Sequence, residues 1–452
     1  MPIYEAEQGS IQSFQLSFFR VKVEDFVEQL LSKEATESPS DVKTADNLVQ
    51  TLPKWYDEVK FNQARRFYWH NCYGLTLAML LGLVNVLAVP SILKILVGAR
   101  RSNDVYPAFK RYLSTFLHAV SWFETDLKPG SHSWESVYKV RKRHILMSKA
   151  AMLKGQGIIC QRDLALTLFG FIGFTFLKPE KFGVETLQKD DWDAYNQFWR
   201  VIGYMIGIED RYNICRNSVE ETRQVCQLIL QRVYTPCLTY PPEYFEYMAH
   251  IMLEGVSSAN PTVNTPSLLY WTKYLAEVPG YVYTEGERIQ FQQLLKDKLN
   301  GSSEDTGVDS FTLMSKPFIE NSSKKRLLYV RDYNSFETIP EYKELSIFSR
   351  LKLMFHSYFT RIYTTYYGRR FLNATFLFII KLMKRHPKMT FLMFNIKVSA
   401  RYLFNFPLDN SGLKPNSVFK KQTTKLHWYK AIVSCWQRIC GSSDTADVHG
   451  RR

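Results

Sequence analysis

The chain has 452 residues, of which 46% are hydrophobic and 15% aromatic. This composition supports a sizeable packed core and excludes a chain that is disordered along its whole length. The net charge of +15 is uneven, because residues 350–440 hold 17 Lys and Arg and one acid, Asp409, whereas the other residues hold 41 basic and 42 acidic side chains.

The cysteines and the N-terminal residues indicate the cellular compartment of the protein. The seven cysteines are scattered and include no C-x-x-C pair. This argues against a disulfide framework and a structural zinc site, and it favours a reducing compartment. The segment Met1–Glu7 lacks the basic and apolar stretches of a secretion signal. We therefore expect an intracellular protein whose sequons at Asn300, Asn321 and Asn373 are unused.

Polar stretches divide the sequence into four regions. We expect an N-terminal extension at 1–52, a helical domain at 53–300, a linker at 301–340 and a basic, aromatic-rich helical region at 341–452. From residue 53 onward, apolar residues recur at helical spacing between turn signals, and strand signals are scarce. This pattern predicts an all-α fold. The expected helices cover 104–124, 134–153, 162–176, 190–206, 217–234, 241–255, 265–276 and 285–298.

The stretch Tyr73–Leu93 is uncharged over 21 residues. About 20 apolar residues suffice to cross a bilayer, so a transmembrane helix is one interpretation. The other is a buried core helix that ends near Pro90 and is followed by a second helix, Ser91–Ala99. We favour the core helix.

His144 is the candidate metal ligand. It lies with Val137, Val140, Arg141 and Ala151 along one stripe of the expected helix 134–153. An imidazole in an apolar pocket can ligate haem iron, and a neighbouring cation such as Arg141 can pair with a haem propionate. Spacing alone favours the alternative, a buried or half-buried structural histidine. An unperturbed imidazole would lose its iron below about pH 6, because only the neutral ring ligates.

Arg111 and Thr115 are one turn apart on the expected helix 104–124 and therefore share a face. A guanidinium and a hydroxyl can hydrogen-bond a bound oxygen species or position a water. The alternative is an exposed arginine and an ordinary helical threonine. His118 falls on the same side of this helix, and we rank it and His132 below His144.

Four segments in order resemble a known family. They are Arg111-x-x-x-Thr115, Val140-Arg141-x-x-His144, Asp163–Phe171 and Phe198–Ile208. Together they are similar to the haem oxygenase-type family that contains bacterial rubber oxygenase (latex clearing protein) and the fungal, endoplasmic-reticulum-bound MpaB-type oxygenases. The resemblance covers roughly residues 55–300.

The resemblance implies a globin-like helical core that binds haem b and cleaves a carbon–carbon double bond of an isoprenoid chain with dioxygen. It implies that His144 is the proximal iron ligand and that Arg111 and Thr115 line the distal side. Two features depart from the rubber-cleaving members. Ser114 stands where they have a lysine, and residues 88–98 contain no match to their catalytic acid.

The basic region interleaves aromatic residues with Lys and Arg, as in Tyr358–Tyr367 and Phe371–Asn395. This composition is typical of a helix on an anionic membrane surface, of a nucleic-acid-binding segment or of a solvated face. We favour a membrane surface contacted by residues 345–440, since no nucleic-acid-binding fold signature is present. An endoplasmic-reticulum or other membrane-associated location would follow.

These observations predict a haem b-dependent oxygenase that acts with dioxygen on an apolar, isoprenoid or lipid-like substrate. In this hypothesis His144 and Arg141 bind the cofactor, and Arg111 and Thr115 act at the distal side. The alternative is a non-catalytic helical protein at a membrane surface that retains the fold without the chemistry.

Overall fold

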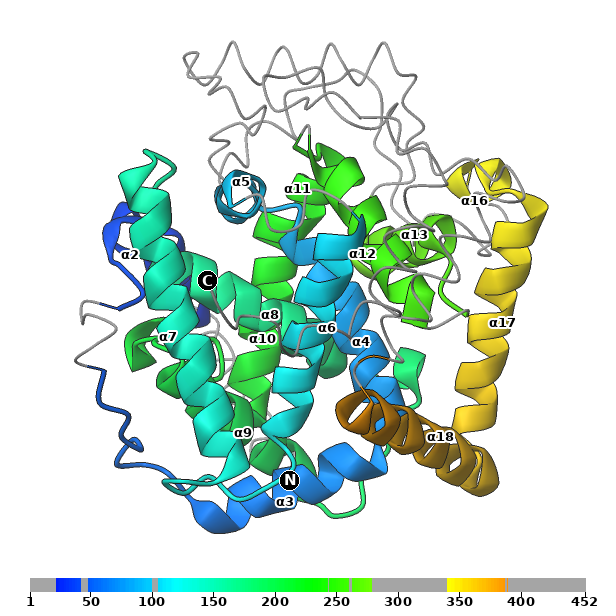
Figure 1. Ribbon diagram of the computed structural model, residues 1–452, viewed down its shortest axis with the longest axis horizontal. Coiled ribbons are helices and arrows are strands. Elements are labelled where there is room, and N and C mark those ends of the chain that lie inside the picture. Colours follow the sequence, from blue (N-terminus) through cyan, green and yellow to red (C-terminus); the bar gives the residue numbers. More distant parts are fainter. Residues whose placement is uncertain are drawn as a thin grey trace, which may run out of the picture.

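The computed structural model describes residues 22–41, 48–99, 105–242, 244–259, 262–278, 340–386 and 388. In this part of the chain the regular elements are helices, and the β structure is one isolated bridge between Pro39 and Cys160. The predicted all-α fold is confirmed (Figure 1). The expected helix 285–298, the linker before residue 340 and the basic residues after 388 lie outside the described residues.

The elements follow one another from a helix over residues 22–31 to the last described helix near residue 385. In chain order they are α2 (Lys33–Glu37), α3 (Glu58–His70), α4 (Cys72–Val86), α5 (Pro90–Gly98), α6 (Val105–Ser121), α7 (His132–Leu153), α8 (Gln161–Leu177), the 3-10 helix η1 (Pro179–Phe182), α9 (Asp191–Met205), η2 (Asp210–Tyr212), α10 (Val219–Ile229), the π-helical turn η3 (Leu230–Tyr234), α11 (Thr235–Thr239), α12 (Phe245–Ala259), α13 (Thr265–Leu275), α16 (Pro340–Glu344), α17 (Ile347–Tyr363) and α18 (Tyr366–Arg385).

Helix α8 lies at the centre of the fold. Of its 17 residues, 14 are buried, and it contacts α2, α4, α9 and α10 (Figure 1). Its crossing with α4 brings Gly82 against Gly170 so closely that a Cβ at Gly82 would overlap the carbonyl oxygen of Gly170. The two glycines therefore set the distance between the central helices.

The uncharged stretch Tyr73–Leu93 forms α4 and the start of α5. Ten of the 15 residues of α4 are buried, and the helix ends at Val86. Pro90 then opens α5, where its missing N–H and fixed φ suit the first turn. This placement agrees with the core-helix interpretation. None of the described helices alone is long and apolar enough to cross a bilayer; α4 and α5 together meet that criterion, with a bend of 88° between them.

The C-terminal hairpin, defined as α17 and α18, is attached to the junction of α3 and α4 by buried polar side chains. Arg369, 4% exposed, donates to Asn71 Oδ1 at 2.7 Å and to the Gly183 carbonyl at 3.0 Å. Asn373 donates to the His70 carbonyl at 2.6 Å and accepts from the Tyr363 hydroxyl at 2.9 Å. The hairpin is thus part of the described fold, and the Asn373 sequon is buried within it.

The glycine contact between α4 and α8 gives a stability prediction. Replacing Gly82 with Ala puts a methyl group into the Gly170 backbone, so the two helices must separate. We expect a loss of about 1–3 kcal/mol, as in other overpacked cores. Thermal or urea unfolding measures it, and a variant as stable as the wild type would show that the helices do not meet here.

Candidate functional site

Helices α6 and α7 frame the predicted site. The Ser131 side chain caps α7 by accepting from the Trp134 backbone N–H at 3.2 Å, and the turn before it contains Gly130 at φ +82°. The two helices contact each other directly. On its other side α6 packs on α12, where Gly255 lies against the backbone of Phe109.

His144 points one ring nitrogen into the protein. Its side chain is partly exposed overall, but Nδ1 has no accessible surface and no hydrogen-bond partner. Burial, and to a smaller extent the Arg111 guanidinium, lowers the pKa of His144 to about 4. The imidazole is therefore neutral at physiological pH, the protonation state that a metal ligand requires. This moves the expected loss of ligation from about pH 6 to about pH 4.

Arg111 lies near enough to His144 for its positive charge to add, after burial, to the lowering of the pKa of that ring. Thr115 lies one turn further along α6. Its hydroxyl donates to the Arg111 carbonyl at 3.1 Å, so its proton is used within the helix and its oxygen lone pairs are left to accept.

Arg141 has a different environment from the one proposed. Its Nε donates to Asp41 Oδ2 at 2.6 Å, and Nη1 lies 3.5 Å from the Met205 carbonyl at the end of α9. The Asp41 side chain is 4% exposed. Arg141 thus joins α7 to residues before α3 and to α9.

His118 is a second neutral histidine, and its role was not evident from the sequence. Arg143 Nη1 lies 3.0 Å from His118 Nε2, and His118 Nδ1 lies 2.8 Å from Ser136 Oγ. A guanidinium only donates, so Nε2 must accept and Nδ1 must carry the proton. Burial, with the nearby charges of Arg143 and Lys139 among others, lowers the pKa of His118 to about 4.

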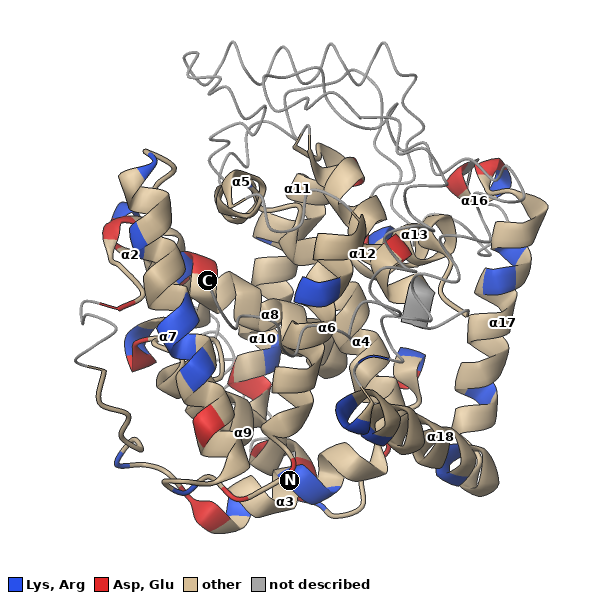
Figure 2. Ribbon diagram, in the orientation of Figure 1, with Lys and Arg blue, Asp and Glu red and all other residues tan. Residues whose placement is uncertain are grey.

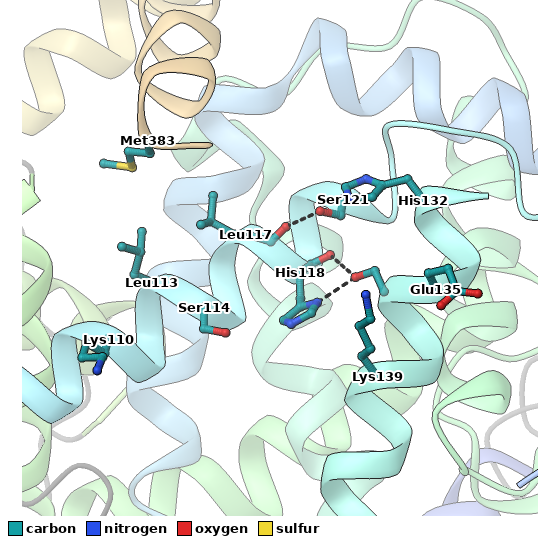
Figure 3. Close-up of a pocket in the computed structure, with 11 residues that line it drawn as sticks. Lys110, Leu113, Ser114, Leu117, His118, Ser121, His132, Glu135, Lys139 and Met383 are labelled. Carbon is teal, nitrogen blue, oxygen red and sulfur yellow. Dashed lines mark hydrogen bonds between the residues drawn. The ribbon is translucent and has the colours of Figure 1, made fainter. Parts of the chain in front are cut away.

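A cavity of about 320 Å³ lies between α6, α7 and α18, beside His118 (Figure 3). Ser114 is one of its lining residues. The full lining is Lys110, Leu113, Ser114, Leu117, His118, Ser121, His132, Glu135, Ser136, Lys139 and Met383. His144, Arg111 and Thr115 are not among them, so the cavity and the His144 position are two separate features of the α6–α7 layer.

The predicted residues differ in how well their surroundings suit them to hold a haem. His144 fits the ligand role, since it offers a neutral imidazole with an enclosed, unpartnered nitrogen. Arg111 supplies positive charge next to it, whereas Arg141 is paired with Asp41. In the described ranges no group of three or more His, Cys, Asp or Glu side chains is arranged around a common metal position.

No protein-family model and no curated protein matches this chain. Among solved structures, one described as latex clearing protein in the closed state aligns with a TM-score of 0.41 and 16% sequence identity. The alignment covers 66% of this chain and 86% of that one. The likeness is a distant one in fold.

The lowered pKa of His144 makes stability depend on pH. The unfolded chain protonates this ring near pH 6.5, whereas the folded protein protonates it only near pH 4. Titration of His144 therefore leaves the free energy of unfolding unchanged above pH 6.5 and lowers it as the pH drops toward 4. Between pH 7 and pH 5 the free energy of unfolding of His144→Gln should fall by roughly 1–2 kcal/mol less than that of the wild type.

Urea unfolding at the two pH values measures this difference. His132→Gln is the matched control, because His132 is on the same helix but exposed and paired with Glu124. Equal pH dependence in the wild type and His144→Gln would show that the folded protein does not lower the pKa of His144.

Proposed function

We propose that this protein is a haem b-binding oxygenase that acts with dioxygen on an apolar, isoprenoid or lipid-like substrate, and that His144 would hold the haem iron. One observation carries the proposal. The His144 imidazole is neutral, and its Nδ1 is enclosed and has no hydrogen-bond partner among the described residues. A buried polar atom without a partner is costly, and a bond to iron would satisfy it.

Three residues of this chain would have separate roles at a bound haem. His144 donates its lone pair, and its low pKa keeps the lone pair free of a proton. The Arg111 charge favours negative charge that develops nearby, and the Thr115 oxygen can accept a hydrogen bond from a water or substrate hydroxyl. When bound, a haem would supply the iron centre for chemistry with dioxygen.

Haem uptake tests the ligand assignment. Titration of haem into the folded protein should give a Soret band, and His144→Ala should weaken the affinity more than tenfold because the axial bond is lost. His132→Ala, on the same helix, should behave as wild type. Affinity should stay level from pH 8 to about pH 5 and fall near pH 4, following the pKa of His144.

Two outcomes would contradict the proposal. One is a folded wild type that takes up no haem. The other is a His144→Ala variant with unchanged spectrum and affinity, which would place the ligand elsewhere.

A second proposal concerns the C-terminal hairpin, whose outer faces expose large apolar side chains. They are Ile347, Phe348, Leu351, Met354, Phe355 and Tyr358 on α17 and Tyr366, Tyr367, Phe371, Phe378 and Ile379 on α18. Lys and Arg lie along the same helices (Figure 2), and the described residues from 345 onward include no acid. Apolar side chains with positive charge fit an anionic membrane surface. A non-catalytic membrane protein would share this face, so only haem uptake distinguishes the two functions.

Liposome flotation tests the membrane proposal. The wild type should float with vesicles that contain phosphatidylserine and much less with pure phosphatidylcholine. The double variant Phe371→Ser/Phe378→Ser should bind several-fold more weakly, because it loses exposed apolar area. Met152→Ser/Leu153→Ser removes exposed apolar residues from α7 and should not change binding.

Equal flotation of the two variants would refute the assignment to the C-terminal hairpin. Retention on RNA or DNA with no flotation would favour the nucleic-acid interpretation of the basic region.

A further inference from the structure

The cavity between α6, α7 and α18 has an apolar wall. Leu113 and Leu117 of α6 and Met383 of α18 line this side (Figure 3). Phe116 and Phe376 hold the two helices together next to it, with ring centroids 6.0 Å apart. Because α18 belongs to the C-terminal hairpin, the apolar wall joins the helical core to the helix that exposes Phe371 and Phe378.

The other side of the cavity is made of hydroxyl groups around a neutral ring. Ser114, Ser121 and Ser136 all line it. Ser136 and Arg143 occupy both nitrogens of His118, so this ring is held in one orientation.

Cations outnumber acids around this polar side. Lys110 and Lys139 line the cavity, and Arg143 Nη1 lies 3.5 Å from Ser114 Oγ and 3.0 Å from His118 Nε2. Glu135 is the acid in the lining.

Glu124, next to the cavity, is already paired. It accepts from His132 at 3.0 Å and from Lys384. Lys384 Nζ also lies 3.3 Å from Ser121 Oγ, which fixes α18 over this end of the cavity.

The geometry points to a binding site for an acidic amphiphile, a molecule with a carboxylate or phosphate group on an apolar chain. The anionic group would meet Lys139 and the Ser114 hydroxyl, beside the Arg143 guanidinium, and the chain would lie against Leu113, Leu117 and Met383. Charge-assisted hydrogen bonds favour such a head group. The volume of about 320 Å³ is at the lower end for ligand pockets, so it holds the head group and the first part of the chain. This site involves neither His144 nor Arg111.

Competition against a fluorescent fatty acid tests the site in the full-length protein below the critical micelle concentration. Oleate, a carboxylate, and oleoyl lysophosphatidate, a phosphate, should each displace the probe. Their relative affinities show which head group the site prefers. Oleyl alcohol, which lacks the charge, and inorganic phosphate, which lacks the chain, should each bind at least tenfold more weakly.

Variants locate the site. Lys139 makes no ion pair with a described residue, so Lys139→Gln should fold normally and weaken oleate binding about tenfold, with rescue by Lys139→Arg. Leu113→Trp, whose larger side chain would occupy the cavity beside its apolar wall, should also weaken oleate binding. Lys142→Gln on the same helix, outside the lining, is the matched control. Phe371→Ser/Phe378→Ser should keep oleate binding, which separates this cavity from membrane attachment.

Three results would overturn the proposal: equal affinity for oleate and oleyl alcohol, inorganic phosphate as tight a ligand as the lipids, or Lys139→Gln and Leu113→Trp both binding like the wild type.

Discussion

The close crossing of α4 and α8 is the constraint on which the described fold depends. Gly82 and Gly170 let the two backbones meet, and α8 is buried nearly all round as a result. Helices α2, α9 and α10 then pack against α8, which leaves α6 and α7 in an outer layer. The candidate residues His144 and Arg111 and the cavity all lie in that outer layer.

The α6–α7 contact contains many polar side chains, although most helix contacts in this fold are apolar. Arg143, His118 and Ser136 form one hydrogen-bonded group, and the Ser133 hydroxyl lies 2.9 Å from the Ser121 carbonyl. A buried polar contact of this kind is stable only when each group has a partner. His144 Nδ1 is one of several buried side-chain atoms without a partner among the described residues, and it is the physical basis of the haem proposal. The C-terminal hairpin is held by a similar polar contact. The buried Arg369 guanidinium donates to Asn71 and to the Gly183 carbonyl and lies over the Tyr363 ring.

The sequence predicted the helices well where apolar spacing and turn residues agree. The expected helix 265–276 is α13 (Thr265–Leu275), and 162–176 is α8 (Gln161–Leu177). It did not predict the π-helical turn η3 or the short α11, because neither changes the helical spacing of the apolar residues. Nor was a helix predicted within the N-terminal extension at 1–52, where Ser32 caps the short helix α2.

The candidate site was only partly predictable. The stripe on helix 134–153 and the helical spacing of Arg111 and Thr115 predicted which residues share a helix face, and their roles stay predictions. The ion pair of Arg141 with Asp41 and the group around His118 join residues far apart in sequence, so no local pattern indicates them. The pKa of His144 depends on burial, which is why the expected pH limit of about 6 is replaced by about 4.

Resonance Raman spectroscopy of the ferrous, haem-loaded protein tests the His144 assignment most directly. If His144 ligates the iron, the iron–histidine stretching band should shift when histidine is labelled with ¹⁵N, and it should vanish in His144→Gly and return when free imidazole is added. The same band in wild type and His144→Gly, without added imidazole, would contradict the account.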